Sequence, residues 1–208
     1  MTQAQARKVL GSDLSTWWRA YLTCALYCGL RLGELTGLRW EDVDFTAGVI
    51  RVRHSLKKEP DGLAPGDLKR DWTKRTLEMH EPVRVTLTAL RKRQAADKLR
   101  LGPHYLDKHD LVFRDDAGRA MSRQRMNVRF KDVMERAGLG RDWQPRETLH
   151  SFASVASEHG TSIEDLADAM GHINANVTRA VYRQQISDTV ARAPAAMDRA
   201  LAAGSEKS

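Results

Sequence analysis

Arg31 is the first residue whose surroundings suggest chemistry. It lies between Gly29 and Gly33, and Glu34 follows three residues after it. Glycines allow the backbone to approach a ligand closely, and a carboxylate at this spacing can orient the guanidinium group. The segment could hold a cation against a ligand, although a surface ion pair at a helix junction has the same pattern.

Lys69 is the second candidate, in a charged stretch that we expect to form a tight hairpin. A lysine held over a groove can donate a proton to a leaving oxygen if its pKa is lowered. A solvated, charged hairpin would contain the same residue types.

Two later segments add imidazole and phenol groups. Arg146, Leu149 and His150 are three and four residues apart, so they share one face of a helix. His172 follows a glycine, and Tyr182 comes ten residues later. The two rings could meet in one pocket, or they could be a helix cap and a half-buried aromatic residue.

The elements that must position these groups are mostly helices. Apolar residues recur every three or four positions, and capping residues precede several of these runs. Capping boxes are expected at Thr2 with Gln5 and at Thr161 with Glu164. The expected helices cover residues 2–10, 14–28, 31–40, 83–99, 122–137, 145–159, 161–170, 177–185 and 187–203.

The strands are expected early in the chain. Residues 49–53 have the β-branched content of a strand, and short runs at 68–69 and 75–79 are expected to pair with it. Residues 57–67 are rich in glycine, proline and charge and are expected to form a loop. The predicted fold class is α+β: mostly α-helical, with a small three-stranded antiparallel sheet.

The composition suits one domain with a core. Of 208 residues, 41% are hydrophobic and 29% are charged, and the net charge is +7. The chain has no run of about 18 apolar residues, and its first residues are polar, so we expect a cytoplasmic protein with no membrane partner. Cys24 and Cys28, four residues apart in an apolar helix, are expected to be buried thiols, and no metal site is expected.

The order and spacing of the four chemical segments together resemble the catalytic domain of the tyrosine recombinases, the phage-integrase family. Residues 29–35 and 38–44 look like the family's first box, and residues 170–172 and 178–182 look like its last. The similarity runs from Gln3 to about Ile186.

The resemblance has implications for domain organisation. It implies a catalytic domain over residues 1–203 and a flexible tail over residues 204–208. Members of the family generally carry an N-terminal core-binding domain as well, and we expect it to be absent from this chain.

Members of this family cut DNA with a tyrosine nucleophile, form a 3′-phosphotyrosyl link and rejoin the strand to a different partner. Attack on a phosphodiester adds negative charge to the non-bridging oxygens, so preorganised cations are needed and no cofactor is implied. By position, the resemblance implies a catalytic set of Arg31, Lys69, Arg146, His172 and Tyr182.

Each implied residue has a role in the family. Arg31 corresponds to an arginine that clamps the phosphate, His172 to a histidine that donates to it, and Tyr182 to the nucleophile. Lys69 corresponds to the lysine that protonates the departing 5′ oxygen, but Lys74 competes for this role because the hairpin register cannot be fixed from one sequence. Arg146 occupies a position where the family usually has histidine and sometimes lysine or arginine.

Leu149 departs from the family pattern. His150 and the residues after it fix the register, so leucine stands where the family has a second clamping arginine. Losing one preorganised donor costs roughly 10²–10³ in rate, and losing an arginine in phosphoryl transfer costs about 10³–10⁵. We expect impaired cleavage with little rescue by Arg146, which starts about 5 Å away along the helix axis. The alternative is a non-catalytic DNA-binding remnant or regulator.

The expected partner is double-stranded DNA, with self-association as a tetramer on it. Basic residues gather on the helix after Ser122, a region that lies against DNA in the family. Such contacts position a protein on DNA rather than read its sequence. The expected DNA-binding residues are Arg123, Arg125, Arg129 and Lys131.

Overall fold

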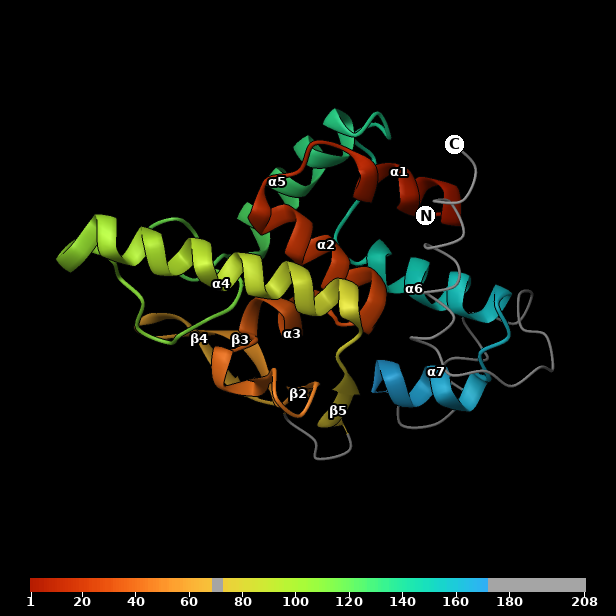
Figure 1. The fold of residues 1–208 in the computed structure, drawn as a ribbon, viewed down its shortest axis with the longest axis horizontal. Coiled ribbons are helices and arrows are strands. Elements are labelled where there is room, and N and C mark those ends of the chain that lie inside the picture. Colours follow the sequence, from red (N-terminus) through yellow and green to blue (C-terminus); the bar gives the residue numbers. More distant parts are fainter. Residues whose placement is uncertain (69–72, 172–208) are drawn as a thin grey trace.

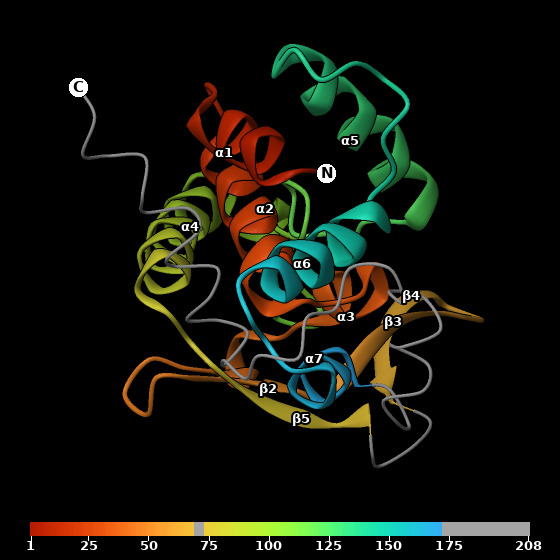
Figure 2. The same ribbon diagram turned by 90° about the vertical axis from the view of Figure 1, so that its right-hand side faces the viewer.

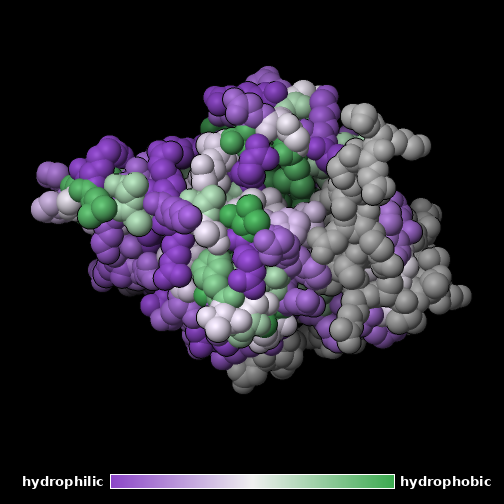
Figure 3. All heavy atoms as spheres, viewed as in Figure 1, coloured by the Kyte–Doolittle hydropathy of each residue, from purple (hydrophilic) through white to green (hydrophobic). Residues whose placement is uncertain are grey.

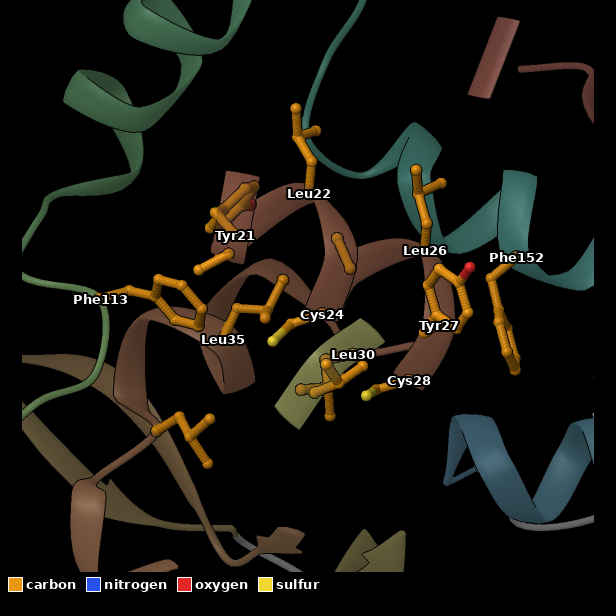
Figure 4. Packing of buried hydrophobic residues seen from close by; sticks show 14 of the residues in the cluster. Tyr21, Leu22, Cys24, Leu26, Tyr27, Cys28, Leu30, Leu35, Phe113 and Phe152 are labelled. Atoms are coloured by element: carbon orange, nitrogen blue, oxygen red, sulfur yellow. The ribbon is translucent and has the colours of Figure 1, made fainter. Parts of the chain in front are cut away.

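Helix α2, Thr16–Cys28, is the centre of the fold because almost all of its surface is apolar. Every residue from Ala20 to Cys28 is buried. Helices α4 and α6 pack against it, and Figure 4 shows its side chains meeting those of Phe113 and Phe152 from distant parts of the chain. A helix that is hydrophobic all round must be covered by neighbours on every side.

The computed structural model describes residues 1–68 and 73–171. Over these residues the fold is α+β, as expected. Its helices are α1 Gln3–Gly11, α2, α3 Leu32–Gly37, α4 Glu81–Leu101, α5 Arg123–Arg136, α6 Glu147–Glu158 and α7 Ile163–Met170. Its strands are β1 Val43–Asp44, β2 Val49–Val52, β3 His54–Glu59, β4 Gly62–Asp67 and β5 Arg75–Glu78.

The strands lie on one side of α2, and α1 and α5 lie on the other (Figures 1 and 2). Helix α7 packs against α6 and β5, so the end of the described chain returns to the strand side of the molecule. Helix α4 runs along α2 and buries Val83, Leu87 and Leu90. Val85 on the same helix is exposed.

The main sheet has three antiparallel strands in the order β1-β2-β5. Ile50 of β2 pairs with Val43 on one side and Leu77 on the other. The predicted strands at 49–53 and 75–79 are confirmed as β2 and β5. The third member was predicted wrongly: it is β1, and Leu68 lies outside the strands. A strand of two residues, such as β1, is too short to show alternation in a sequence.

Residues 57–67 form a hairpin rather than the expected loop. Strands β3 and β4 pair from His54 with Asp67 to Glu59 with Gly62, leaving Pro60 and Asp61 as the turn. Glycine and proline suggested a loop because they disfavour central strands, but a two-stranded ribbon with exposed edges tolerates both. Strand β3 gains its support from α3, which packs against it.

The helix ends test the predicted capping boxes. Thr2 and Gln5 form the expected box at α1. The second box was wrong: Ser162 caps α7 by accepting a hydrogen bond from the Asp165 N–H, and the Thr161 hydroxyl is buried without a partner among the described residues. Serine and threonine are adjacent here, and spacing by itself did not distinguish which one begins the helix.

Cys24 and Cys28 are buried free thiols, as expected. Burial raises the pKa of the Cys24 thiol well above its usual range and that of Cys28 to about 12, so neither is a thiolate at neutral pH. Over residues 1–68 and 73–171, no three histidine, cysteine or acidic side chains gather in a way that could hold a metal.

The described surface is mostly polar. The face in Figure 3 is largely hydrophilic, with apolar residues in small patches. The large apolar side chains that are exposed are Val85, Leu99, Leu106 and Val128. None of the described helices has the length and apolar character needed to cross a membrane.

The predicted helices at 177–185 and 187–203 lie outside the described residues. So do Lys69, His172 and Tyr182.

Candidate nucleic-acid interface and strand-transfer site

Arg31 lies at the start of α3, immediately after the chain leaves α2. Gly29 ends α2 in the left-handed region with φ 58°, and a Cβ at this position would lie 2.6 Å from the ring of Phe152. Glycine is therefore required both for the turn and for the close approach of α6. The turn directs Arg31 away from the core, and its side chain is 36% exposed.

Glu34 holds Arg31 at two points. One carboxylate oxygen, Oε2, accepts from the Arg31 backbone N–H at 2.9 Å, and Oε1 accepts from Arg31 Nη1 at 2.8 Å. Glu34 is only 2% exposed, so this ion pair has one buried and one accessible partner. The geometry confirms that the carboxylate three residues after Arg31 orients it.

Arg75 is a second, buried arginine on the same carboxylate. Its Nη1 and Nη2 donate to the two oxygens of Glu34 at 3.2 and 2.9 Å, in a two-point fork. Burial favours the neutral form of Glu34, but the charges and hydrogen bonds of Arg75 and Arg31 outweigh it. The pKa of Glu34 is therefore lowered.

The carboxyl end of α7 docks on both arginines. Arg31 Nη2 donates to the Gly171 carbonyl at 3.2 Å, and Arg75 Nε donates to the Ala169 carbonyl at 2.7 Å. Carbonyls at a helix end lack partners within the helix, and cations are favoured there. Gly171 has φ 63°, and a Cβ on it would lie 3.0 Å from Arg75 Nη1. The residue directly before His172 is thus fixed beside Arg31.

A cleft of about 850 Å³ opens beside Arg31. Hairpin β3–β4 forms one wall, and α5 and the start of α6 form the other. Its basic lining residues are Arg31, Lys58, Arg123 and Arg146. Leu68 and Thr73, which border the segment containing Lys69, also line it.

Arg146 and Leu149 both reach the cleft from the start of α6. Arg146 is exposed and makes no hydrogen bond or ion pair with the described residues. Leu149 is partly buried and packs against the hydrophobic core. Leu149, which the resemblance places at the position of a family arginine, therefore lines the cleft and presents only an apolar side chain there.

Helix α5 divides the four predicted DNA-binding residues into groups. Arg123 lies on the cleft wall, and Lys131 lies with it beside a shallow hollow on the same helix. Arg125 is ion-paired with Asp115 at 3.0 Å. Arg129 lines a different hollow, which it shares with Trp18. Of the four, Arg123 lines the cleft, and Lys131 lies near it on the neighbouring hollow.

Lys74, the alternative to Lys69, lies near Asp67 at a distance of 3.7 Å. It is exposed and lies immediately before β5. Lys69 lies outside the described residues.

Sequence reasoning missed Arg75 and Lys58. Lys58 lies on β3, in the part of that strand that falls within the expected loop over residues 57–67. Arg75 begins β5 with its side chain only 8% exposed. The available signal for Arg75 was its position at the start of the predicted strand 75–79. An arginine in a strand of a partly buried sheet requires a partner for its charge.

The sequence profile of the phage integrase family matches residues 1–188. The chain belongs to this family. Among relatives, it is 31% identical over 207 residues to an integrase of Streptomyces ambofaciens, with 95% of this chain and 52% of the relative covered. It is 26% identical to a XerC-like tyrosine recombinase of Caldanaerobacter subterraneus subsp. tengcongensis, with 81% and 46% covered. The chain thus spans about half the length of these phage-integrase relatives.

Solved structures share the phage-integrase fold. The Tn1549 transposon integrase, in complex with transposon right end DNA, superposes with a TM-score of 0.74 at 24% identity, covering 88% of this chain and 60% of that one. XerA recombinase superposes with a TM-score of 0.69 at 20% identity, covering 100% and 64%. At these identities the likeness establishes the fold.

Proposed function

We propose that this chain binds double-stranded DNA and performs the site-specific strand cleavage and rejoining of tyrosine recombinases, at a rate limited by Leu149. The observation that carries the proposal is the cleft in which Arg31, Arg123 and Arg146 meet with Leu149. These three arginines, with Lys58 on the same lining, suit a phosphodiester, whose non-bridging oxygens gain charge during attack. Relatives named as integrases and recombinases support the same chemistry.

In the proposed reaction the Tyr182 phenol gives up its proton to water as its oxygen attacks the scissile phosphorus. A bond forms between phosphorus and this oxygen, and the bond from phosphorus to the 5′ oxygen breaks. Lys69, or Lys74 in its place, protonates the departing 5′ oxygen, while Arg31 and His172 donate to the non-bridging oxygens. A 5′ hydroxyl then attacks the phosphotyrosyl ester and releases the tyrosine, so rejoining needs no external energy source.

Leu149 weakens this reaction at one defined point. The side chain faces the cleft but can neither donate a hydrogen bond nor balance charge. Arg146 has its head group free of the described residues and supplies part of the missing charge. It lies one turn earlier on the helix, and catalytic geometry tolerates little displacement. Cleavage is therefore slow, while DNA binding is retained.

The second candidate is a non-catalytic DNA-binding protein of the same fold. Leu149 is the observation that favours it, since the remaining cations can hold DNA without cutting it. In either case we propose that the chain self-associates on DNA and acts in the cytoplasm.

The test measures covalent adducts on nicked duplexes. A library of duplexes randomised around a nick loses a short fragment after cleavage, so the phosphotyrosyl adduct is trapped and migrates slowly on a denaturing gel. We expect slow adduct formation by the wild type, formation faster by about 10²–10³ in Leu149→Arg, and none in Tyr182→Phe. Leu149→Met serves as the uncharged control and should match the wild type.

Two results would overturn the proposal. Equal adduct rates for the wild type and Leu149→Arg would show that Leu149 does not limit cleavage. No adduct from either protein, with binding intact, would support the non-catalytic candidate instead.

A further inference from the structure

We propose that Arg75 is a positioning residue that lets Arg31 act as a cation toward DNA, an inference that rests on the proposed function. Arg75 does so by pairing with Glu34 on its buried side, which offsets the negative charge of the carboxylate. The catalytic set implied by the family resemblance does not include Arg75. Its side chain is 8% exposed, and it lies outside the lining of the cleft, so it acts through Glu34 and not on the phosphate.

The charge balance around Glu34 is the first argument. One buried carboxylate contacts two guanidinium groups, through Arg31 Nη1 at 2.8 Å and Arg75 Nη2 at 2.9 Å. The group of three keeps a net charge of about +1 because arginine stays protonated in proteins. Without Arg75, the same carboxylate would neutralise Arg31 in a one-to-one pair. Arg75 thus preserves the positive charge that Arg31 presents to the cleft.

The direction of Arg31 is the second argument. Arg75 uses Nη1 and Nη2 on Glu34 and Nε on the Ala169 carbonyl, so its whole donor edge is fixed. Arg31 in turn donates to the Gly171 carbonyl. The two arginines and Glu34 therefore tie α3, β5 and the end of α7 together. A shift of Arg75 would move both the carboxylate and the helix end that hold Arg31.

The fork also explains why lysine should not replace arginine here. Two parallel hydrogen bonds fix the plane of the carboxylate, whereas an ammonium group is a single point charge. Arg75→Lys keeps the charge and loses the fork. It therefore separates the electrostatic part of the role from the geometric part.

The experiment compares four variants of the full chain: Arg75→Met, Arg75→Lys, Arg75→Met with Glu34→Gln, and Arg51→Met. Arg51 is the matched control because it lies on the neighbouring strand β2, pairs with Asp44 at 2.9 Å and loses the same charge. The probe is a labelled 40-base-pair duplex of random sequence. Affinity is measured from low to high salt, thermal unfolding is followed in parallel, and adduct rates are measured at saturating DNA.

We expect Arg75→Met to reduce the salt slope of DNA binding by about one, because Arg31 is neutralised. Adding Glu34→Gln should restore the slope but not the adduct rate, which should stay lower by about 10² because Arg31 is no longer held. Arg75→Lys should keep the slope and lose rate. Arg51→Met should change the adduct rate less than twofold.

The slope and rate separate the role of Arg75 from a contribution to folding. If folded Arg75→Met binds with the wild-type slope, or if Glu34→Gln fails to restore a lost slope, the inference is wrong. If Arg75→Met does not fold, Arg75→Lys decides. An adduct rate for Arg75→Lys equal to that of the wild type overturns the inference. If the wild type itself forms no adduct, a lowered salt slope for Arg75→Lys overturns it. Binding is measured without cleavage, so a chain that binds but never cleaves contradicts the proposed function and leaves the charge role testable.

Discussion

Glu34 is the buried carboxylate on which the site's geometry depends. Its two arginine partners lower its pKa despite burial, so the folded chain takes up this proton at lower pH than the unfolded chain. The stability it supplies is fully present above the unfolded value of about 4.3 and is lost as pH falls through the folded value. Acid should therefore weaken the link between Arg31 and Arg75.

The variant Glu34→Gln measures this dependence. At pH 7 we expect it to be less stable than the wild type by about 3 kcal/mol, because two arginines lose a charged partner. The difference in unfolding free energy should shrink as the pH falls below the unfolded pKa of about 4.3 and then through the lowered pKa of the folded state. Chemical unfolding at several pH values checks this, and a difference that stays constant into acid would contradict it.

At the residue scale the sequence predicted some of the site and not all of it. Arg31 with Glu34 was predictable because their contact is local, three residues along the chain. Leu149 was found because the residues after it fix the register. Arg75 was not predicted, because its contact with Glu34 spans 41 residues and depends on the pairing of β5 with β2.

At the scale of elements, the packing of α3 on β3 forms one side of the cleft. Gly37 lies so close to β3 that a Cβ would be 2.5 Å from the Leu56 backbone nitrogen and 2.7 Å from the Ser55 carbonyl carbon. Backbone atoms paired in a hairpin cannot move aside as a flexible side chain could. The contact therefore requires glycine at this position.

Gly37→Ala should destabilise the chain by about 1–3 kcal/mol, the usual range for overpacking. Gly11→Ala is the control, since a Cβ at Gly11 would meet nothing within 4 Å. Its unfolding free energy should stay within about 0.5 kcal/mol of the wild type. Urea unfolding checks both, and equal stability of the two variants would show that α3 does not press on β3.

The hairpin also shows where local sequence patterns stop being informative. Strand β3 has no alternation of buried and exposed residues, and β4 contains Pro65 and Gly66. The hairpin is supported by α3, which packs against β3 and is remote in sequence from β4. Helices such as α2 and α5 were predicted well because their caps and apolar spacing are local signals.

At the scale of the whole molecule, the cleft defines the face that should meet DNA. Arg123 lines its α5 side, and Lys131 lines a neighbouring hollow on the same helix. Neither makes an ion pair with the described residues, whereas Arg125 is already paired with Asp115. When a cationic side chain without an ion-pair partner binds a DNA phosphate, it releases more counterions than one already paired with a carboxylate. The three residues carry the same charge on one helix and so form a matched set.

We expect Arg123→Gln and Lys131→Gln each to lower the salt slope of duplex binding by about one. Arg125→Gln should lower it by clearly less, because Asp115 offsets part of its charge. Fluorescence anisotropy with a random-sequence duplex over a range of salt concentrations checks this. A larger loss in Arg125→Gln than in Arg123→Gln would place the DNA on a different face.

The most direct test of the proposed strand transfer is the rate of phosphotyrosyl formation at saturating nicked DNA, where differences in affinity no longer matter. The ratio of the Leu149→Arg rate to the wild-type rate should be about 10²–10³, with both adducts abolished by Tyr182→Phe. A ratio near one, or an adduct that survives Tyr182→Phe, would contradict the assignment of Leu149 and Tyr182 to one active site.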